Sequence, residues 1–311
     1  MKTAFLFPGQ GSQYVGMGKD FYRAYDTVFK PIYEEAEAIL NIDMKTICFS
    51  GPEAILTSTD ITQPAILMHS VGIARLLAYE GIQPNYVAGH SVGQFAALVA
   101  AEVLSFEEAL RIVRKRGQCM SAVQKEGAML ATAFSKIERS EELLVLAEKY
   151  NVDLAGDNSP TQLVFAGETE GIELLLEEIQ QIEGVRAKRL NVSHAFHSRL
   201  MSSMVEEFQT YCEEFEFKEA KIPLILNCSV NETRNPALIF QDVIDQCTKT
   251  VRWTETIQTL LLNEVNTFLE VGPKKTLTGL MRAYDYEGQA LSNHSVMAFR
   301  KNLEKTLTEV V

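Results

Sequence analysis

The sequence lacks the features that mark secreted, disulfide-rich and membrane-spanning chains. Its 311 residues contain no Cys-x-x-Cys pair, and the cysteines are odd in number, at Cys48, Cys119, Cys212, Cys228 and Cys247. A disulfide framework and a structural zinc site are therefore not expected, and scattered free thiols suit a reducing compartment. No segment approaches the roughly 18 uninterrupted apolar residues of a membrane span, and the apolar run before Pro8 is too short for a signal peptide. We expect a cytoplasmic protein.

Positive charge is also in the minority. Lys and Arg number 29 against 41 Asp and Glu, which gives a formal net charge of -12. A protein that binds nucleic acid or an anionic membrane surface normally presents a basic field. Neither nucleic acid nor a membrane is therefore an expected partner. Hydrophobic residues make up 46% of the chain, which is ample for a large core in one or two domains.

Short apolar segments alternate with longer amphipathic ones. The apolar segments predict strands at 2–9, 86–89, 222–230 and 265–273. The amphipathic segments predict helices at 60–80, 94–104, 106–121, 199–213 and 253–263. Strands that alternate with helices are typical of a parallel sheet covered by helices on both faces.

The segment from Gly127 to His197 breaks this alternation. Its pattern predicts strand, helix, two strands, helix and strand, in that order, at 128–134, 140–149, around 157–167, 171–182 and 185–192. This β-α-β-β-α-β order is that of a ferredoxin-like unit, and the Asn-Ser-Pro turn supports pairing of the middle strands. We therefore predict a ferredoxin-like subdomain at 126–197, inserted into a larger domain formed by 1–125 and 198–311.

A serine lies between two glycines at the predicted junction of a strand and a helix, in GHSVGQ (89–94). Gly-x-Ser-x-Gly in this context is the nucleophile elbow of α/β-hydrolase-like domains, although such short matches also arise by chance. Gly89 and Gly93 would remove side chains that collide across the turn. Ser91 would project its hydroxyl above the carboxyl ends of the strands, where the helix N-terminus and the N–H of Val92 support negative charge. The large domain is therefore predicted to be α/β-hydrolase-like.

A serine hydroxyl needs a base to act as a nucleophile, and the sequence offers five histidines. Three are set aside because of their predicted positions. His90 lies inside the elbow, His69 lies in the middle of a helix, and His294 lies in a polar C-terminal loop. The segment SHAFHS (193–198) lies where the inserted unit returns to the large domain, so its histidines could face a cleft between the two. His194 and His197 are both candidates, and spacing alone does not choose between them.

Six stretches, taken in order, resemble one family. They are FLFPGQGSQYVGMG (5–18), ITQPAILMHS (61–70), GHSVGQ (89–94), RKRGQCM (114–120), VSHAFHSRLM (192–201), and VRWTETI (251–257) with VGPKKTLTGL (271–280). In these stretches the chain is similar to the malonyl-CoA:acyl-carrier-protein transacylases, including the discrete, trans-acting acyltransferases of polyketide assembly. The resemblance covers essentially the whole chain.

The resemblance assigns the catalytic groups. It implies that His197 is the base, and that the backbone carbonyl of Gln246, instead of an acidic side chain, orients it. It implies that the backbone N–H of Gln10 joins that of Val92 in an oxyanion hole, although the glycine-rich segment around Gln10 could be only a tight turn. His194 is then left with a structural role.

Arg116 lies 25 residues after Ser91, where the family places an arginine that holds the free carboxylate of malonyl. A planar guanidinium can form two parallel charge-assisted hydrogen bonds with a carboxylate. From the local sequence alone, RIVRKR (111–116) could equally be the solvated face of a helix. Hydrolytic relatives tend to lack this arginine, so the resemblance favours malonyl transfer over hydrolysis.

Further residues are implied in substrate binding. A phenyl ring at Phe196, beside the base, would crowd an α-methyl branch and disfavour methylmalonyl by ~1–3 kcal/mol, although Phe196 could also be plain core packing. The resemblance also implies that His90, Met120 and Gln63 bind substrate.

The elbow departs from the family's usual Gly-His-Ser-Leu-Gly-Glu at two positions, Val92 and Gln94. Valine for leucine is a modest change of volume beside the nucleophile. Gln94 removes one negative charge from the first turn of the helix but keeps the capacity to form hydrogen bonds. These changes leave the reaction rate and the acyl preference open.

The resemblance implies a reaction in two halves. Ser91, deprotonated by His197, attacks the thioester of malonyl-CoA, and the phosphopantetheine thiol of an acyl carrier protein then takes the malonyl group. Malonyl-CoA and the carrier are the expected partners, no metal or redox cofactor is expected, and the family suggests a monomer. Fatty-acid and polyketide synthesis both remain open as pathways. The alternatives are a serine acyl hydrolase that clears carriers and, disfavoured by the intact site residues, an inactive carrier-binding module.

Overall fold

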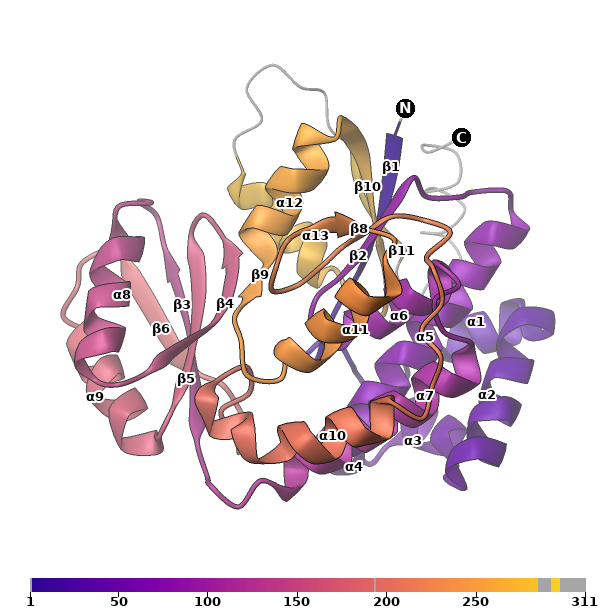
Figure 1. The fold of residues 1–311 in the computed structure, drawn as a ribbon, viewed down its shortest axis with the longest axis horizontal. Coiled ribbons are helices and arrows are strands. Elements are labelled where there is room, and N and C mark those ends of the chain that lie inside the picture. The colour runs from indigo at the N-terminus through magenta and orange to yellow at the C-terminus, as the bar shows by residue number, and fades with distance from the viewer. Residues whose placement is uncertain (1, 193, 285–291, 297–311) are drawn as a thin grey trace.

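The computed structural model describes residues 2–192, 194–284 and 292–296. Two β-sheets organise the chain, one of six strands and one of five. Figure 1 shows the five-stranded sheet on the left, with helices α8 (Arg139–Lys149) and α9 (Thr169–Ile179) beside it, and the remaining helices around the larger sheet. The protein therefore has a mixed α/β architecture with two sheets, as the alternating sequence pattern predicts.

Strands from both ends of the chain meet at the centre of the larger sheet. Its strand order is β11-β10-β1-β2-β7-β8, and all neighbouring strands are parallel except the antiparallel pair β7 and β8. The bounds are β1 (Lys2–Phe7), β2 (Tyr86–Gly89), β7 (Leu224–Ile225), β8 (Glu232–Thr233), β10 (Val265–Val271) and β11 (Ser292–Val296). The carboxyl ends of β1 and β2 lie side by side, because Phe7 pairs with Gly89.

Helices cover both faces of this sheet, because its central strand is apolar on both. Successive side chains of a strand point to opposite faces, and in β1 Phe5 and Phe7 join one hydrophobic cluster while Ala4 and Leu6 join another. The first cluster includes residues of α5 (Thr59–Tyr79) and α6 (Gly93–Ala100). The second includes residues of α12 (Trp253–Leu262) and α13 (Thr276–Leu280).

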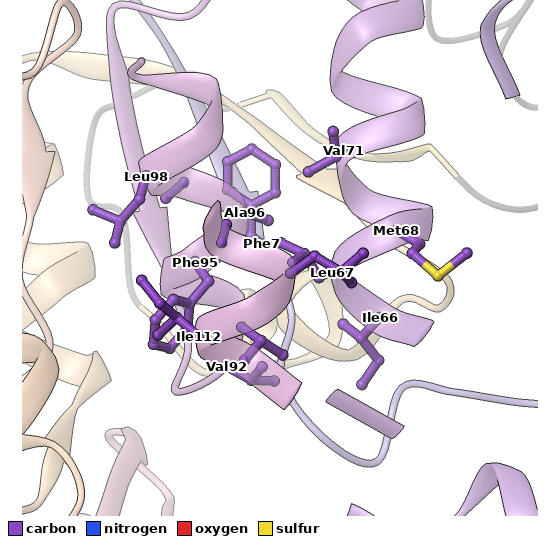
Figure 2. Packing of buried hydrophobic residues seen from close by; sticks show 14 of the residues in the cluster. Phe7, Ile66, Leu67, Met68, Val71, Val92, Phe95, Ala96, Leu98 and Ile112 are labelled. Atoms are coloured by element: carbon purple, nitrogen blue, oxygen red, sulfur yellow. The ribbon is translucent and has the colours of Figure 1, made fainter. Parts of the chain in front are cut away.

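The first cluster anchors the start of α6. Figure 2 shows Phe7 of β1 near Leu67 and Val71 of α5, with Val92 and Phe95 in the same cluster. Val92, directly after Ser91, is only 1% exposed. The residue that follows the predicted nucleophile is therefore fixed in the core, and its packing restricts the movement of the turn that carries Ser91.

The five-stranded sheet has the order β6-β3-β5-β4-β9, with antiparallel neighbours except the parallel pair β4 and β9. Its bounds are β3 (Ala128–Phe134), β4 (Asp153–Ser159), β5 (Gln162–Gly167), β6 (Val185–Arg189) and β9 (Val251–Arg252). With α8 and α9, the first four strands give the predicted β-α-β-β-α-β order. Strand β9 comes from outside 126–197 and was not predicted, because two residues carry no periodicity.

The remaining helices pack around the first cluster and the ends of the sheets. They are α1 (Lys19–Ala24), α2 (Asp26–Leu40), α3 (Met44–Ser50), α4 (Glu53–Leu56), α7 (Phe106–Ala122), α10 (Val205–Cys212), α11 (Pro236–Asp245), and the 3₁₀ turns η1 (Arg199–Met204) and η2 (Met281–Ala283). Helix α7 begins with a capping box between Ser105 and Glu108, which satisfies two N–H groups of its first turn. This cap fixes where the helix that carries Arg116 starts.

Helix α5 passes through the centre of the first cluster. It is the one described helix whose length and composition would also fit a membrane span. Of its apolar window, 83% is buried inside the protein. Its apolar residues therefore form core, and His69 in its middle is fully buried, as predicted for a packed helix residue.

The strand predicted at 222–230 is largely absent, since β7 covers only Leu224–Ile225. The physical reason is a competing acceptor. The backbone N–H groups of Asn227, Cys228 and Ser229 donate to the carboxylate of Asp242 at 2.8, 3.0 and 3.2 Å. Those groups therefore cannot extend the ladder of a strand.

His294 was predicted to lie in a polar loop, and that prediction was wrong. It lies in β11, where it pairs with Leu269 of β10 at the edge of the larger sheet. The polar sequence SNHSV (292–296) hides this strand, because an edge strand buries less apolar surface than a central one. The predicted helix at 94–104 is also shorter and ends at Ala100, because Glu102 takes a left-handed φ of 58°.

Candidate active site

Ser91 lies on a sharp turn between β2 and α6. Its φ of 52° is in the left-handed region, which a residue with a side chain adopts only when its surroundings enforce it. A Cβ at Gly89 would lie 2.1 Å from the backbone carbon of Gly93, and a Cβ at Gly93 would lie 2.1 Å from the carbonyl oxygen of Phe7. Both glycines are therefore required for the turn to close against β1.

His197 lies opposite Ser91. The Ser91 Oγ is 2.8 Å from the Nε2 of His197, and the Nδ1 of His197 is 2.5 Å from the backbone oxygen of Gln246. A carbonyl only accepts hydrogen bonds, so Nδ1 carries the proton and Nε2 is left to accept the hydroxyl of Ser91. This is the arrangement in which an imidazole removes the proton of a nucleophile.

His194, the other candidate base, is directed elsewhere. Its Nε2 lies 3.0 Å from the backbone oxygen of Val123, and its ring stacks on that of Phe196 at a centroid distance of 6.2 Å. The structure therefore places His197, and not His194, in contact with the nucleophile.

The imidazole of His197 is buried, and its charged form is strongly disfavoured. Burial lowers its pKa to about 3, and the nearby charge of Arg116 lowers it further than burial alone would, against the opposing effect of the hydrogen bond to Gln246. The ring is therefore neutral, and able to accept a proton, across the physiological range.

Arg116 is buried beside the nucleophile. It is 1% exposed, so the interpretation of its segment as a solvated helix face does not hold at this residue. Its guanidinium donates from Nη1 to Gln63 Oε1 at 2.8 Å, and from Nη2 to Gln246 Oε1 at 2.9 Å and to Ser91 Oγ at 3.2 Å. Burial lowers its pKa from the usual value, which shows how poorly the site solvates the charge.

No acidic side chain neutralises this guanidinium within the part of the chain that the structure describes, since none of the ion pairs there includes Arg116. Its three acceptors are two amide oxygens and one hydroxyl, all neutral. A buried charge normally has a counter-charge. The site is therefore prepared for an anion that comes with the substrate.

Two backbone amides near Ser91 are available to stabilise negative charge. Among the described residues, the N–H groups of Gln10 and Val92 donate to no protein acceptor, whereas the N–H of Ser91 donates to Asn227 Oδ1 at 2.8 Å. Ser91 thus cannot contribute its own N–H to an oxyanion. Gln10 and Val92 are the candidates that the sequence predicted, and their N–H groups remain available to a ligand.

A cavity of about 170 Å³ opens in front of these groups. Eight of the ten predicted site residues line it: Gln10, Gln63, His90, Ser91, Arg116, Met120, Phe196 and His197. The other two lie just behind, Val92 in the core and Gln246 against Arg116 and His197. A larger and more open groove of about 680 Å³, lined partly by Arg75 and Phe106, contains neither Ser91 nor His197.

The rest of the lining comes from residues 126–197, and apart from Val192 no sequence signal marked it. These residues are Met129, Ala155, Gly156, Asn158, Val164, Leu190 and Val192. They are mostly small or apolar, and only Val192 stands in one of the six stretches. The others contribute because the five-stranded sheet, and the segment that follows β6, lie over Ser91. They exclude water from the nucleophile and leave a narrow space for an acyl group.

His90, Gln63 and Met120 hold the walls of the cavity. The Nε2 of His90 lies 2.8 Å from Asn158 Oδ1, a contact that ties the elbow to β4. Burial lowers the pKa of His90, so its ring is neutral. The Nε2 of Gln63 donates to the sulfur of Met120 at 3.3 Å, which leaves Gln63 Oε1 directed at Arg116.

The sequence matches the acyl transferase domain family over residues 4–309. The chain belongs to this family. It is 38% identical over 285 residues to the malonyl CoA-acyl carrier protein transacylase of Bacillus subtilis (strain 168), covering 90% of each chain. It is also 38% identical over 282 residues to the enzyme of the same name from Synechocystis, covering 91% of this chain and 93% of the relative.

Solved structures agree with this assignment. The malonyl CoA-acyl carrier protein transacylase of Clostridium perfringens superposes with a TM-score of 0.91 at 31% identity, covering 100% of this chain and 97% of that one. An acyl carrier protein S-malonyltransferase from Vibrio cholerae gives a TM-score of 0.91 at 34% identity, covering 98% and 100%. The resemblance predicted from six sequence stretches is confirmed.

In this acyl transferase, three polar residues near the site were missed by sequence reasoning. They are Asn227, which accepts the N–H of Ser91; Asp242, which accepts three backbone N–H groups; and Asn158, which contacts His90. None stands in a motif, and only the unusual Gln94 hinted at a polar neighbour. The described residues contain no group of three His, Cys, Asp or Glu side chains that could hold a metal, and the absence of a metal requirement stays a prediction.

Proposed function

We propose that the protein transfers a malonyl group from malonyl-CoA to the phosphopantetheine thiol of an acyl carrier protein, through a malonyl ester of Ser91. The observation that carries this proposal is the buried guanidinium of Arg116, which lies 3.2 Å from the nucleophile and faces no carboxylate among the described residues. A substrate with a free carboxylate two bonds from its thioester carbonyl can supply that charge. The relatives named for malonyl transfer support the same substrate.

In the first half-reaction, His197 Nε2 takes the proton of Ser91 as Oγ attacks the thioester carbonyl of malonyl-CoA. The N–H groups of Gln10 and Val92 stabilise the oxyanion of the tetrahedral intermediate. The carbon–sulfur bond then breaks, and the proton on His197 goes to the departing thiolate of CoA. The malonyl carboxylate remains bound to Arg116.

The second half-reaction runs through the same groups in reverse. The thiol of the carrier's phosphopantetheine gives its proton to His197 and attacks the ester carbonyl of malonyl-Ser91. Collapse of the intermediate returns the proton to Ser91 Oγ. The cycle is balanced without a metal or redox cofactor, which we propose the enzyme does not require.

Substrate binding also tunes the base. The charge of Arg116 contributes to the low pKa of His197, so a bound malonyl carboxylate, by offsetting that charge, raises the pKa of His197. A base with a pKa nearer the working pH removes a proton more effectively. The acid group of the substrate thus helps to activate the base that attacks it.

Phe196 supports selection of malonyl over methylmalonyl. Its ring lines the cavity, is only 7% exposed, and is held by stacking on His194. A ring that cannot move aside excludes an added methyl group more strongly than a flexible one. We propose that Phe196 excludes α-branched acyl groups.

We further propose that 126–197 is a ferredoxin-like subdomain inserted into an α/β-hydrolase-like domain of 1–125 and 198–311. One hydrophobic cluster, which includes Leu130, Leu143, Phe165 and Leu175, lies entirely within the insertion. A segment with its own core can be treated as a unit. Strand β9 is the exception, since it extends the second sheet from outside this range.

The setting of the enzyme is also part of the proposal. All five cysteines are free thiols, which suits the cytoplasm. We propose a monomer that serves fatty-acid synthesis, as the relatives' carrier-protein names suggest, with a polyketide line as the alternative pathway.

The proposed function is tested by mass spectrometry of the intact protein after mixing with malonyl-CoA. The wild-type chain gains one malonyl group on Ser91, keeps it in water, and loses it to an added acyl carrier protein. Arg116→Ala reduces malonylation by more than about a hundredfold, because two charge-assisted hydrogen bonds are lost. Arg111→Ala is the matched control, since Arg111 lies on the same helix in an exposed pair with Glu107. Rapid loss of the group to water without a carrier would instead indicate a hydrolase.

A further inference from the structure

We propose that Asp242 is a positioning residue. Through hydrogen bonds it fixes the orientation of the side-chain amides of Gln94 and Gln246, and these hold Arg116 beside Ser91. Asp242 is 3% exposed and Gln94 is 1% exposed. Neither lines the acyl cavity. This inference rests on the proposed function, because it concerns how the enzyme holds the acid group of malonyl.

The four side chains form one chain of hydrogen bonds. Gln94 Nε2 donates to Asp242 Oδ2 at 3.0 Å. Gln246 Nε2 donates to Gln94 Oε1, and Arg116 Nη2 donates to Gln246 Oε1 at 2.9 Å. The chain thus runs without interruption from a buried carboxylate to a buried guanidinium.

The two ends of this chain determine its direction. A carboxylate only accepts hydrogen bonds, and a guanidinium only donates them. The amide of Gln94 must therefore turn its nitrogen to Asp242 and its oxygen to Gln246, and Gln246 must turn its oxygen to Arg116. With a charge of opposite sign at each end, the chain has a single satisfied arrangement.

A branch of the same network reaches the nucleophile. Asn227 Nδ2 donates to Gln94 Oε1 at 3.1 Å and to Gly89 O at 2.8 Å. With its nitrogen so engaged, Asn227 directs Oδ1 to the N–H of Ser91 at 2.8 Å. The carboxylate of Asp242 also accepts the backbone N–H of Asn227 at 2.8 Å, so it fixes this branch as well.

Gln246 connects the network to the base. Its side chain accepts from Arg116, and its backbone oxygen accepts from Nδ1 of His197. One residue therefore places both the cation that holds the substrate and the base that activates the serine. Asp242 and Gln94 act through the side chain of Gln246, which holds Arg116, whereas His197 is held by its backbone oxygen. Neither Asp242 nor Gln94 touches the reacting atoms.

Gln94 must be an amide as long as Asp242 is a carboxylate. In Gln94→Glu, two carboxylates would face each other across about 3 Å, which is strongly unfavourable in a buried site. In Asp242→Asn, the new amide can keep its oxygen toward Gln94 only by turning its nitrogen to the backbone N–H groups of Cys228 and Ser229, which lose their acceptor. In the other orientation its nitrogen would face the N–H of Asn227 and, unless Gln94 turned over, the amide nitrogen of Gln94. If Gln94 turned over, its amide nitrogen would face the amide nitrogen of Gln246. If Gln246 then turned over as well, its nitrogen would face the guanidinium of Arg116.

The double variant Gln94→Glu/Asp242→Asn restores the direction of the chain. The new amide at position 242 can donate to the new carboxylate at position 94. That carboxylate can accept from Gln246 and Asn227, so Gln246 again turns its oxygen to Arg116. In this arrangement the nitrogen at position 242 also faces the backbone N–H of Asn227, which loses its acceptor. Gln94→Glu alone, which sets two carboxylates together, should still be slower than the double variant, although the double variant makes two substitutions. This order of activities has no explanation in size or burial, because each replacement is nearly isosteric with the residue it replaces.

The experiment measures the rate of Ser91 acylation in the full chain by intact mass, with malonyl-CoA and with acetyl-CoA. A fluorophosphonate, which reacts with an activated serine but has no carboxylate, reports separately on Ser91 and His197. We expect each single variant to lose malonylation by at least about tenfold, since one hydrogen bond to a charged group is lost or reversed. We expect a much smaller loss with acetyl-CoA and the fluorophosphonate, and faster malonylation in the double variant than in Gln94→Glu.

The matched control is the pair of exposed Gln241 and partly exposed Asp245 on α11, where Gln241 Nε2 donates to Asp245 Oδ1 at 3.1 Å and Asp245 also pairs with Lys249. Gln241→Glu, Asp245→Asn and their combination make the same chemical changes outside the network, and malonylation should stay within about twofold of wild type.

Two results would overturn the inference: a double variant no faster than Gln94→Glu, or a parallel loss with malonyl-CoA and the fluorophosphonate. A wild-type chain that reacts with the fluorophosphonate but not with malonyl-CoA would overturn the proposed function first, and this inference with it.

Discussion

Ser91 and His197 both have left-handed backbone conformations, with φ of 52° and 58°. Such conformations cost on the order of 1–3 kcal/mol each in residues with side chains, so the surrounding structure must hold them. For Ser91 the supports are the two glycines of the turn and the hydrogen bond to Asn227. For His197 the support is the carbonyl of Gln246. The strain is localised at the two residues whose side chains must meet.

At the same scale, the charge of Arg116 predicts a pH effect. The folded pKa of His197 is about 3, and Arg116 is its second-largest cause. Removing the positive charge favours the imidazolium, so Arg116→Gln raises the pKa of His197. The rate of fluorophosphonate labelling should then begin to fall at a higher pH in the variant than in wild type, because a protonated base cannot accept the proton of Ser91.

The measurement is the labelling rate across the acid range in which both proteins stay folded, with Arg111→Gln as the control. If the labelling rate fell at the same pH in the Arg116 variant and in wild type, the charge of Arg116 would not affect the pKa of His197.

Among the elements, the long periodic ones follow the sequence closely. Strands β1, β2, β3 and β10 and helices α5, α7 and α12 begin and end within a few residues of prediction. Elements too short for periodicity were missed, including strands β8 and β9 and helices α1, α3 and α4, but so were two longer helices, α2 and α11. The strand at 222–230 failed for a different reason, because the carboxylate of Asp242 takes the N–H groups that would have continued it. No local sequence pattern contains that contact.

The residues of the candidate site also fall into a predictable group and an unpredictable one. The groups that stand in motifs, such as Ser91, Arg116 and His197, were predictable, and they converge on one cavity. Asn227 and Asp242 were not, since each matters only through a partner more than a hundred residues away along the chain, Ser91 and Gln94. Sequence patterns identify the groups that react, and tertiary contacts reveal the groups that hold them in place.

The junction of β2 and α6 makes an element-scale prediction. In Gly93→Ala, the new methyl would lie 2.1 Å from the carbonyl oxygen of Phe7, so α6 must shift away from β1. Overpacking of this kind typically costs about 1–3 kcal/mol, and the shift also moves Ser91. We expect a lower melting temperature and a large loss of Ser91 labelling.

Gly279→Ala is the control, since Gly279 lies in helix α13 with open space around it, and alanine there should be neutral or slightly stabilising. If Gly93→Ala matched this control in melting temperature and labelling, the close approach of α6 to β1 would not be what shapes the elbow.

At the scale of the whole molecule, buried histidines couple folding to pH. Burial lowers the pKa of His69 to about 3, as it does for His197, and lowers that of His90 as well. Neither ring nitrogen of His69 has a hydrogen-bond partner among the described residues, and its ring packs edge-on against Phe21. In the unfolded chain each of these histidines titrates near its ordinary value of about 6.5.

The sign of the effect follows from proton uptake. Between about 6.5 and 3 the unfolded state binds protons that the folded state does not, so acid favours unfolding. Within this window His69 and His197 each lower the free energy of unfolding by up to about 1.4 kcal/mol for each unit by which the pH falls. The stability of the protein should therefore be full above about pH 6.5 and should fall steadily below it.

His69→Leu, which removes one of these groups from the apolar core, should flatten the decline between about pH 6 and 4. Denaturant unfolding at several pH values measures the slope directly. Equal slopes in wild type and variant would mean that His69 is not neutral in the folded protein.

The two ends of residues 126–197 lie close together: a Cβ at Gly127 would lie 2.8 Å from the Cβ of Ala195. If this segment is the insertion proposed above, its exchange needs no rerouting of the larger sheet, because the chain leaves and returns at one point. Ser91, Arg116 and the two backbone amides lie outside residues 126–197, whereas the base His197 and most of the lining that covers the acyl cavity lie within them. In evolutionary terms, exchange of this one segment would change the cover over the acyl group, and the incoming segment would have to bring its own histidine base.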